Sequence, residues 1–448
     1  MDDVVFERKI YSEMLDWKQK SNGTTALLIE GAHGVGKSTV AKQFVDKEYA
    51  SRIFIDFSSV SRSTKKLFEE GLGNDIDGFL MKLQVSEGTI LKPRDGAIVF
   101  DGVEKCIRAR EMIKYLVKDS RFDYIETGTM VDLVTKKSNT MVPSEERCLL
   151  MYPMDFEEFL WAKGDRMSIP FLRAAFDRKE PLGDAFHSKF LQMFREYIVV
   201  GGMPEAVAAY SGNKDIESAE KAKREILKRY NKDMTELKVL TGRNVKRVFD
   251  SIPSMLAMQN KLFSPGKIRK GSRTRDYLRA VEALTDAMLV NSSIDCTDPS
   301  PALKLSLDDE VMKCYLLDTG LLVTMALASE NAVESEIYRE LILNRLSINK
   351  GMFFENSVAQ QLRASGHRLI FNRFEKDGKN YEIDFLLSRN NKVHPIEVKS
   401  ASYRSHKSLD EFRKKYGSII GNCYVIHSND LGYENGITYV PIYMTMFL

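Results

Sequence analysis

Short apolar runs alternate with helix-length segments over the first third of the chain. The runs are rich in β-branched and aromatic residues, and they are Ala26–Ile29, Arg52–Phe57, Ala97–Phe100, Tyr124–Thr127 and Cys148–Met151. Such runs are typical of strands in a parallel sheet that helices cover on both faces. The pattern therefore predicts an α/β domain over residues 1–165.

The pattern becomes mainly helical over residues 166–345. The expected helices of this part of the chain, including one that begins just before it, lie near 155–161, 186–200, 218–240, 244–259 and 274–285. A sharp break at Gly201–Pro204 separates two of them. Two short apolar stretches, 287–290 and 313–317, are expected to pair as strands. Helices followed by such a hairpin predict a winged-helix module.

Residues 346–448 return to a mixed pattern. Helices are expected at 353–365 and 408–416, and strands at 367–371, 381–387, 393–399 and 423–426. This order predicts a third, small α/β domain.

Composition narrows the class of protein. The chain has 448 residues, of which 43% are hydrophobic and 29% charged, which is typical of a folded globular protein. Lys and Arg (66) nearly balance Asp and Glu (63), so extensive coating of nucleic acid is not expected, although local basic patches remain possible. The charged N-terminal segment and the lack of an apolar run of ~18 residues argue against a signal peptide and a membrane partner. Five scattered cysteines without a CxxC pair favour a reduced, cytoplasmic protein over a zinc site.

A glycine-rich loop follows the first apolar run. Its residues match the pattern GxxxxGK[ST], and they are Gly31, Ala32, His33, Gly34, Val35, Gly36, Lys37, Ser38 and Thr39. Glycines let successive backbone N–H groups converge on phosphate oxygens, and the N-terminus of the next helix faces the same anion. Lys37 is expected at the β- and γ-phosphates, and Ser38 is expected to bind Mg²⁺. The loop therefore predicts binding of ATP or ADP with Mg²⁺.

Acidic and hydroxyl residues at the neighbouring strand ends suit the second half of an ATP site. Asp101 is expected to hold the Mg²⁺ shell through water. Gly102 stands where many P-loop ATPases carry the glutamate that activates water. Glu104 is either a substitute base, if the chain turns back, or a solvated loop charge. Thr127, with Thr129 nearby, either contacts the γ-phosphate or the attacking water, or is structural.

Two carboxylates and a lysine are expected to meet near the C-terminus. Strand alternation places Glu397 and Lys399 on one face, and a short hairpin would bring Asp384 beside them. Glu355, on the preceding helix, could complete a shell for Mg²⁺ or Mn²⁺. The arrangement resembles the PD-(D/E)xK nuclease fold, which also occurs in proteins that bind without cutting. The alternative interpretation is a solvated strand face with routine cross-strand pairs.

Five cations lie within Lys267–Arg275, inside the expected winged helix. A helix starting at Thr274 would present Arg275 and Arg279 beside them, which is a plausible surface for DNA phosphates. The alternative is a solvated surface.

Taken together, the segments resemble a large family of prokaryotic AAA ATPases that carry a C-terminal domain of largely unassigned function. The resemblance rests on the phosphate loop and on Phe100–Cys106, Tyr152–Phe159, Gly201–Glu205, Tyr315–Gly320, Phe354–Val358, Glu382–Phe385 and Glu397–Lys399. It implies an ATPase domain, a winged helix and a nuclease-like domain.

The resemblance also implies a role for Arg147, which matches an arginine that reaches the phosphate of a neighbouring subunit in a homo-oligomer. A surface arginine in a loop is the alternative. The chain departs from the family at Gly102 and Glu104, at His33–Gly34 in the loop, and at Glu146, where glycine is common. These departures bear on ATP turnover and not on the fold.

Three functions remain open. The leading hypothesis is a nucleotide-dependent switch in which Lys37, Ser38 and Asp101 support slow ATP hydrolysis that controls a DNA-facing module. The second is a metal-dependent nuclease gated by ATP, with Asp384 and Lys399 in its site. The third is an ATP sensor that does not hydrolyse ATP and binds protein partners through its helical middle.

Overall fold

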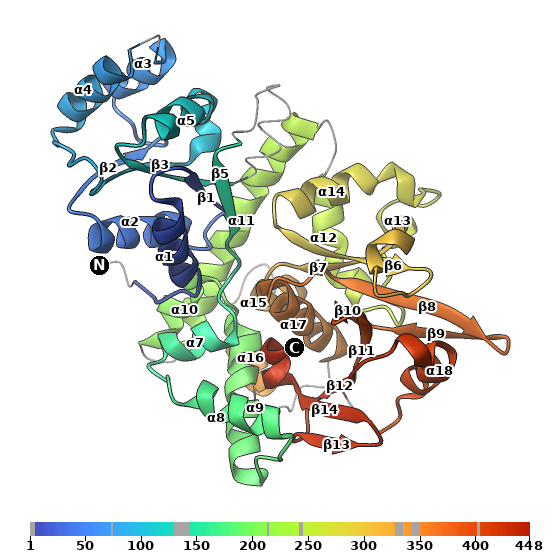
Figure 1. Ribbon diagram of the computed structural model, residues 1–448. Coiled ribbons are helices and arrows are strands. Elements are labelled where there is room, and N and C mark those ends of the chain that lie inside the picture. Colours follow the sequence, from blue (N-terminus) through green and yellow to red (C-terminus); the bar gives the residue numbers. More distant parts are fainter. Residues whose placement is uncertain are drawn as a thin grey trace. The chain divides into compact units, whose positions relative to one another are not determined.

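A computed structural model describes residues 5–72, 75–129, 144–212, 215–241, 245–327, 335–342, 350–400 and 404–448. The chain divides into two compact units. The first is Met1–Tyr152 with Asp286–Met288, and the second is Pro153–Thr285 with Leu289–Leu448. Figure 1 shows their helices and strands.

A parallel sheet forms the centre of the first unit. Its described part has five strands in the order β2-β3-β4-β1-β5, and all neighbouring pairs are parallel. The strands are β1 (Ala26–Glu30), β2 (Ser51–Asp56), β3 (Gly96–Asp101), β4 (Asp123–Gly128) and β5 (Glu146–Leu150). Each overlaps one of the apolar runs, so the expected α/β fold with a parallel sheet is confirmed.

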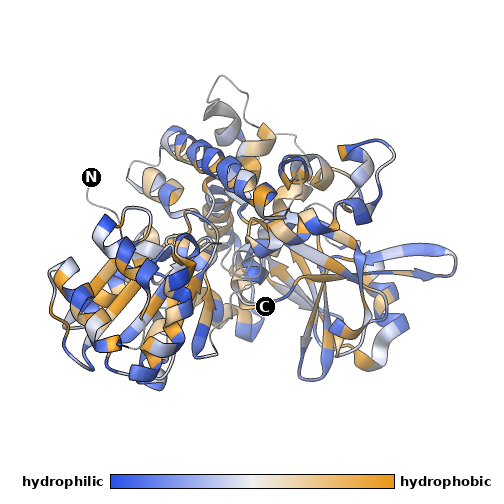
Figure 2. Cartoon of the chain, turned by 90° about the horizontal axis from the view of Figure 1, so that it is seen from above, coloured by the Kyte–Doolittle hydropathy of each residue, from blue (hydrophilic) through white to orange (hydrophobic). Residues whose placement is uncertain are grey.

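Helices cover both faces of this sheet (Figure 1). One face carries α1 (Ile10–Ser21) and α2 (Lys37–Glu48), and the other carries α3 (Arg62–Glu70), α4 (Ile76–Glu87) and α5 (Ile107–Asp119). On the second face the rings of Phe57, Phe68 and Phe100 pack with centroids 5.2 to 6.0 Å apart. Figure 2 shows the strands as the most hydrophobic part of this unit. The buried strands place their carboxyl ends, where the phosphate loop begins, at one edge.

The second unit begins with helices. They are α7 (Phe156–Ala162), α8 (Ser168–Arg178), α9 (Asp184–Val200), α10 (Pro204–Ser211), α11 (Ile216–Thr241), α12 (Val245–Leu256), α13 (Pro265–Ile268) and α14 (Leu278–Asp286). A 3₁₀ turn at Thr274–Asp276 precedes α14, so the helix expected from Thr274 starts four residues later. Among the described residues, no helix combines the length and apolar character that crossing a membrane requires.

The expected break after α9 is a close backbone approach. Gly201 has φ 84°, which favours glycine, and a Cβ there would lie 2.3 Å from the Asp318 carboxylate. Asp318 in turn accepts from the backbone N–H of Gly202 at 2.6 Å. The glycines therefore let the chain turn tightly around a buried acid.

Two sheets and further helices complete the second unit. One described sheet has the order β7-β6-β8-β9 and the other β10-β11-β12-β14-β13. The strands are β6 (Val290–Cys296), β7 (Leu307–Leu316), β8 (Ile370–Lys376), β9 (Lys379–Ile383), β10 (Phe385–Arg389), β11 (Lys392–Val398), β12 (Cys423–His427), β13 (Gly432–Glu434) and β14 (Ile437–Pro441). The helices are α15 (Thr319–Leu327), α16 (Ser335–Ile342), α17 (Lys350–Ala364) and α18 (Lys407–Tyr416), with a 3₁₀ segment at Ile442–Phe447.

The strands β13 and β14 were not expected, and the other strands differ from expectation in two places that bear on the site. The expected hairpin forms as β6 and β7, but β6 also pairs in parallel with β8 through Ile294 and Ile370. The hairpin is therefore half of a sheet that spans the predicted boundary at residue 345. The single strand expected over 381–387 is two strands, because the chain leaves one sheet after β9 and enters the other at β10. Asp384 is the residue at this break.

Candidate functional site

The phosphate loop lies between β1 and α2, as its sequence predicts. Gly34 and Gly36 have φ 83° and 100°, values that glycine adopts without strain. Lys37 opens α2 and is buried. Its ammonium donates to the carbonyl oxygens of Gly31 and Ala32 and to Thr129 Oγ1, each at 2.9 Å. The cation is thus held against the loop's own backbone, facing the end of β4.

Ser38 and Asp101 form the expected pair for a magnesium shell. Ser38 Oγ donates to Asp101 Oδ1 at 2.6 Å, and the hydroxyl of Thr127 donates to the same oxygen. Asp101 and Thr127 are register partners on β3 and β4. A hydroxyl beside a carboxylate offers the hard oxygen ligands that Mg²⁺ prefers. These residues therefore fit a hydrated Mg²⁺ bound with a nucleotide.

Glu104 also lies at this edge of the sheet. Gly102 has φ 72° and starts the 3₁₀ turn Val103–Lys105, which folds the chain back. Glu104 Oε2 then accepts from the backbone N–H of Thr129 at 3.2 Å. Burial raises the pKa of the Glu104 carboxyl, and the Thr129 amide and Lys37 offset part of this rise. Glu104 is half-buried, and its role as a base stays a prediction.

The two threonines have different surroundings. Thr127 orients Asp101, while Thr129 joins Lys37 on one side to Glu104 on the other. Thr129, and not Thr127, therefore contacts Lys37 and Glu104, so it better suits the role near the γ-phosphate that the sequence suggested for Thr127. Both are buried at the carboxyl end of β4.

Arg147 does not lie with the other expected site residues. It is the second residue of β5, in register with Leu27, near the amino ends of the strands. The three further residues of β5 add roughly 10 Å along the strand before the edge that carries the loop. The side chain is 38% exposed and pairs with Asp16 of α1 at 3.1 Å. A role at a neighbouring subunit's phosphate stays a prediction.

A buried ion cluster beneath β4 and β5 was not expected. Arg110 of α5 bonds to Glu146 Oε2 at 2.7 Å and to Glu126 Oε2 at 3.3 Å. Burial, then the hydrogen bond and the charge of Glu146, raise the pKa of Glu126 well above its usual value. Glu146, one of the departures from the family pattern, is therefore a partner of Arg110. The sequence feature that could have revealed this cluster is Glu126, a charged residue inside the apolar run Tyr124–Thr127.

The C-terminal carboxylates lie where two strands meet. Asn390 and Asn391 have φ 49° and 56° and form the two-residue turn between β10 and β11. This hairpin brings Asp384 Oδ2 to within 2.8 Å of the Val398 backbone nitrogen, which donates to it. Glu397 and Lys399 pair with each other through Oε1 and Nζ at 2.5 Å. The hairpin therefore forms as the sequence predicts.

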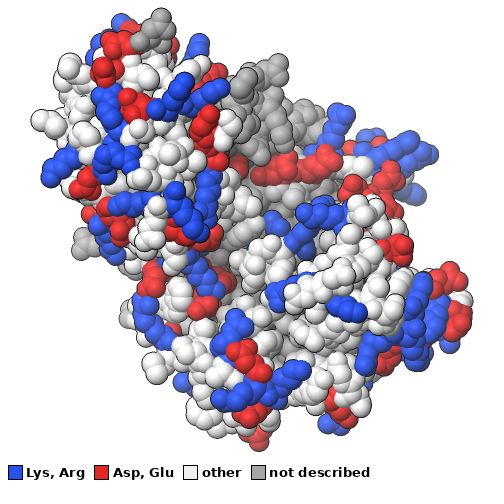
Figure 3. Space-filling model, in the orientation of Figure 1, with Lys and Arg blue, Asp and Glu red and all other residues white. Residues whose placement is uncertain are grey.

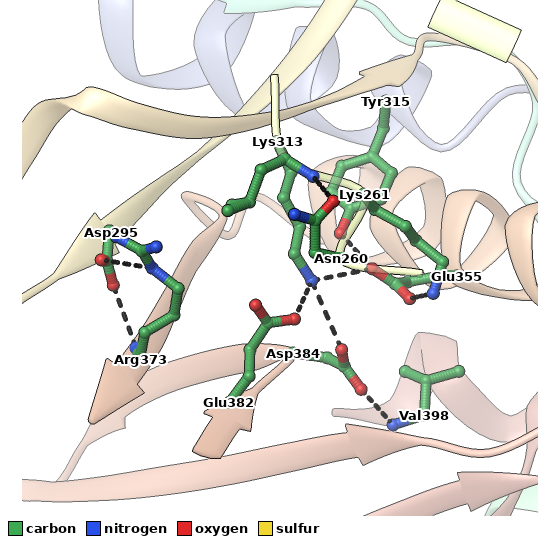
Figure 4. A network of polar contacts seen from close by, with 11 residues as sticks. Asn260, Lys261, Asp295, Lys313, Tyr315, Glu355, Arg373, Glu382, Asp384 and Val398 are labelled. Atoms are coloured by element: carbon green, nitrogen blue, oxygen red, sulfur yellow. Dashed lines mark hydrogen bonds and ion pairs between the residues drawn. The ribbon is translucent and has the colours of Figure 1, made fainter. Parts of the chain in front are cut away.

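Glu355 joins Asp384 through a lysine that sequence reasoning missed. The ammonium of Lys313, from β7, lies 2.7 Å from Glu382 Oε1, 3.1 Å from Glu355 Oε1 and 3.4 Å from Asp384 Oδ1 (Figure 4). Lys261 also pairs with Glu355. Lys313 belongs to the apolar stretch 313–317, and a lysine in such a stretch is the sequence feature that could have revealed its burial.

The charges in this cluster shift one another's pKa values. Burial alone would raise the pKa of Glu355, but the two lysines and the Tyr315 hydroxyl hold it down at about 2. Burial and the nearby Glu355 charge raise the pKa of Asp384, and burial raises that of Glu382. Burial would lower the pKa of Lys313, but the carboxylates raise it above its usual value. The ammonium is therefore firmly charged.

The basic segment is exposed. Its cations are Lys267, Arg269, Lys270, Arg273 and Arg275, with Arg279 nearby. Figure 3 shows Lys and Arg side chains gathered at the turn between α13 and α14. Within the described ranges, no ion pair joins any of these six residues to a carboxylate. Within the described part of the chain, their charge is therefore not neutralised by an ion pair.

Comparisons with known proteins assign the first part of the chain. Residues 23–160 match the family model of an AAA domain, and residues 191–332 and 350–445 match two domains of unknown function (DUF8612 and DUF4143). The uncharacterized protein MJ1544 of Methanocaldococcus jannaschii is 22% identical over 425 residues, which cover 91% of this chain and 83% of that protein.

Solved structures with partial likeness include two archaeal proteins. The Orc1 protein of Aeropyrum pernix, solved in complex with DNA, is 13% identical with a TM-score of 0.26, covering 72% of this chain and 93% of that one. Cdc6p of Pyrobaculum aerophilum is 12% identical with a TM-score of 0.28, covering 77% and 97%. The family match, the phosphate loop and the five-stranded parallel sheet of the described residues agree: the first unit has a P-loop α/β fold, and its residues 23–160 are similar to AAA domains.

Proposed function

We propose that this protein is an ATPase that binds ATP with Mg²⁺, hydrolyses it slowly, and uses its nucleotide state to control a DNA-facing module in the second unit. The observation that carries the proposal is the meeting of Lys37, Ser38, Asp101 and Glu104 at one edge of the sheet. These residues supply a cation for the phosphates, ligands for a metal and a candidate base.

Each residue has a distinct part in the proposed hydrolysis. Lys37 would bind the β- and γ-phosphate oxygens, and Ser38 and Asp101 would hold Mg²⁺, which neutralises phosphate charge when bound. Glu104 would accept a proton from the water that attacks the γ-phosphorus, while the bond from this phosphorus to the β-phosphate oxygen breaks. Thr129 fixes both ends of the site, because its hydroxyl accepts from Lys37 and its N–H donates to Glu104. Slow turnover is expected because Gly102, and not a glutamate, stands at the strand end where many P-loop ATPases carry the base.

The DNA-facing part of the proposal is supported by the basic segment. Helices α12, α13 and α14 precede the β6–β7 hairpin, an order that fits a winged helix. The exposed cations lie on the turn between α13 and α14, where such a module would contact phosphates. Exposed cations that neutralise phosphates release the counterions condensed on the nucleic acid, so the affinity should fall as salt rises.

The test is a titration of duplex DNA, by fluorescence anisotropy, at several salt concentrations and with ATP, ADP or no nucleotide. A variant with Arg269, Arg275 and Arg279 changed to Ala should lower the salt slope by about 2 to 3. Lys189→Ala, another exposed cation in the second unit, is the matched control and should leave the slope unchanged. Equal DNA affinity in all nucleotide states would remove the coupling, since linkage requires a reciprocal effect.

A further inference from the structure

The three carboxylates expected to hold a divalent cation are already engaged by donors of the chain. Asp384 Oδ2 accepts from Val398 N, and its Oδ1 faces Lys313. Both oxygens of Glu397 are engaged as well, by Lys399 and by the backbone N–H of Leu409 at 3.3 Å.

Glu355 is saturated in the same way. Its Oε1 accepts from Tyr315 at 2.6 Å and from Lys313, and its Oε2 accepts from Lys261. Each oxygen of the expected ligand set thus already has an N–H or O–H partner. Among the described residues, no group of three or more His, Cys, Asp or Glu side chains has an arrangement that could hold a metal ion.

Lys313 occupies the centre of this cluster. Its side chain is 1% exposed, and its ammonium faces Glu355, Glu382 and Asp384 together (Figure 4). Mg²⁺ needs oxygen ligands at 2.0–2.1 Å in an octahedral shell and usually retains several waters. A divalent cation between the same carboxylates would lie beside a buried ammonium that repels it. The residues present therefore do not fit a metal.

We propose that Lys313 is a built-in cation that takes the place of a divalent metal ion, so that the C-terminal α/β domain has no metal site at these carboxylates and does not cut nucleic acid. Lys313 comes from β7, whereas Asp384 lies at the break between β9 and β10 and Glu397 lies on β11. If nucleic acid is the partner, which rests on the proposed function, the domain holds it without cleavage.

The cluster also ties the basic segment to the sheets. Lys261 lies in the connection between α12 and α13 and reaches Glu355 of α17. Two residues later, Phe263 N donates to Met312 O at 2.8 Å, next to Lys313 on β7. The connection that leads into the basic segment is therefore fixed at the same cluster. The lysines therefore hold this connection against the sheets, which is a structural role and not the catalytic role of a metal site.

Binding of Mn²⁺ to the full-length protein without nucleotide, measured by electron paramagnetic resonance, tests the proposal. We expect Asp384→Asn to leave the number of bound Mn²⁺ ions per chain unchanged from wild type. We expect Lys313→Met to gain one Mn²⁺ per chain, and Asp384→Asn in that background to remove it. Circular dichroism checks that each variant is folded. If Lys313→Met does not fold, the comparison of wild type with Asp384→Asn still decides.

A Mn²⁺ ion that survives Asp101→Asn but is lost with Asp384→Asn would overturn the proposal. Nicking of a supercoiled plasmid with Mg²⁺ or Mn²⁺ that depends on Asp384 would overturn it as well. Neither readout involves ATP, so failure here leaves the proposed nucleotide switch standing, and failure of the switch leaves this inference standing.

Discussion

Replacing Lys313 by Met should strongly destabilise the second unit. Met is unbranched and only one atom shorter than Lys, so the change removes mainly the charge of the side chain. Lys313 is buried between three carboxylates at 2.7 to 3.4 Å. After the change, Lys261 still pairs with Glu355, while Glu382 and Asp384 lose their cation.

The expected loss follows from these distances. Two unit charges 3.1 Å apart attract by about 5 kcal/mol at an effective dielectric constant of 20. The cost of taking the ions out of water offsets part of this, and breaking a buried pair typically costs about 3–5 kcal/mol. Burial raises the pKa values of Glu382 and Asp384, and the loss of Lys313 should raise them further. One carboxylate can then take up a proton, so the loss should be larger at pH 7.5 than at pH 5.5.

Urea unfolding followed by tryptophan fluorescence measures this effect. The chain has two tryptophans, Trp17 in the first unit and Trp161 in the second, so a Trp17→Phe background makes the signal specific to the second unit. Lys246→Met is the matched control, because Lys246 also pairs with a carboxylate, that of Asp250, but both side chains are 51% exposed, and it should cost about 0–1 kcal/mol. A loss below about 1 kcal/mol for Lys313→Met at pH 7.5 would show that the buried ion cluster does not stabilise the second unit.

Three other changes test separate parts of the structure. The fold raises the pKa of Glu126, so the folded protein holds a proton that the unfolded chain releases above pH 4.5. The unfolding free energy should therefore fall as the pH rises from 4.5 towards the pKa of Glu126 in the folded protein. Glu126→Gln should remove up to about 1.4 kcal/mol per pH unit of this slope in the first unit, and an unchanged slope would contradict the assignment. Arg147→Ala should cost about 0–1 kcal/mol of stability and leave ATP affinity at low protein concentration unchanged, so a drop in that affinity would contradict its placement. Gly202→Ala should destabilise the second unit by about 1–3 kcal/mol or more in urea unfolding, because its Cβ would lie 2.0 Å from the Met154 carbonyl oxygen. If the variant is as stable as wild type, the turn relaxes to admit the Cβ.

Hydrophobic pattern was sufficient for the sheet of the first unit. Each of its strands contains a short apolar run, and the phosphate loop fixes the point where the first strand ends and α2 begins. The position of Asp101 beside Ser38 follows from these two facts, because parallel strands end at one edge. Local pattern and global fold therefore agree in this part of the chain.

Contacts between distant segments were not predictable in the same way. Lys313 and Arg110 are charged residues whose burial depends on partners from other elements, so periodicity cannot reveal their role. The position of the Glu104 side chain depends on the positive φ of Gly102. A glycine in the sequence permits this φ but does not require it. The split of one expected strand at Asp384 reflects pairing in two sheets, and this choice is made by tertiary structure.

Phosphate release from ATP with Mg²⁺ is the most direct test of the proposed DNA-coupled hydrolysis. It is measured for wild type, Glu104→Gln and Lys37→Ala, with and without duplex DNA. We expect slow release by wild type that changes when DNA is added, and none by Lys37→Ala. We expect Glu104→Gln to lower the rate at least about 100-fold while ATP affinity is kept, since general bases typically contribute that much. If wild type binds ATP but releases phosphate no faster than Lys37→Ala, the protein does not hydrolyse ATP. That result would favour a protein that senses ATP without hydrolysing it.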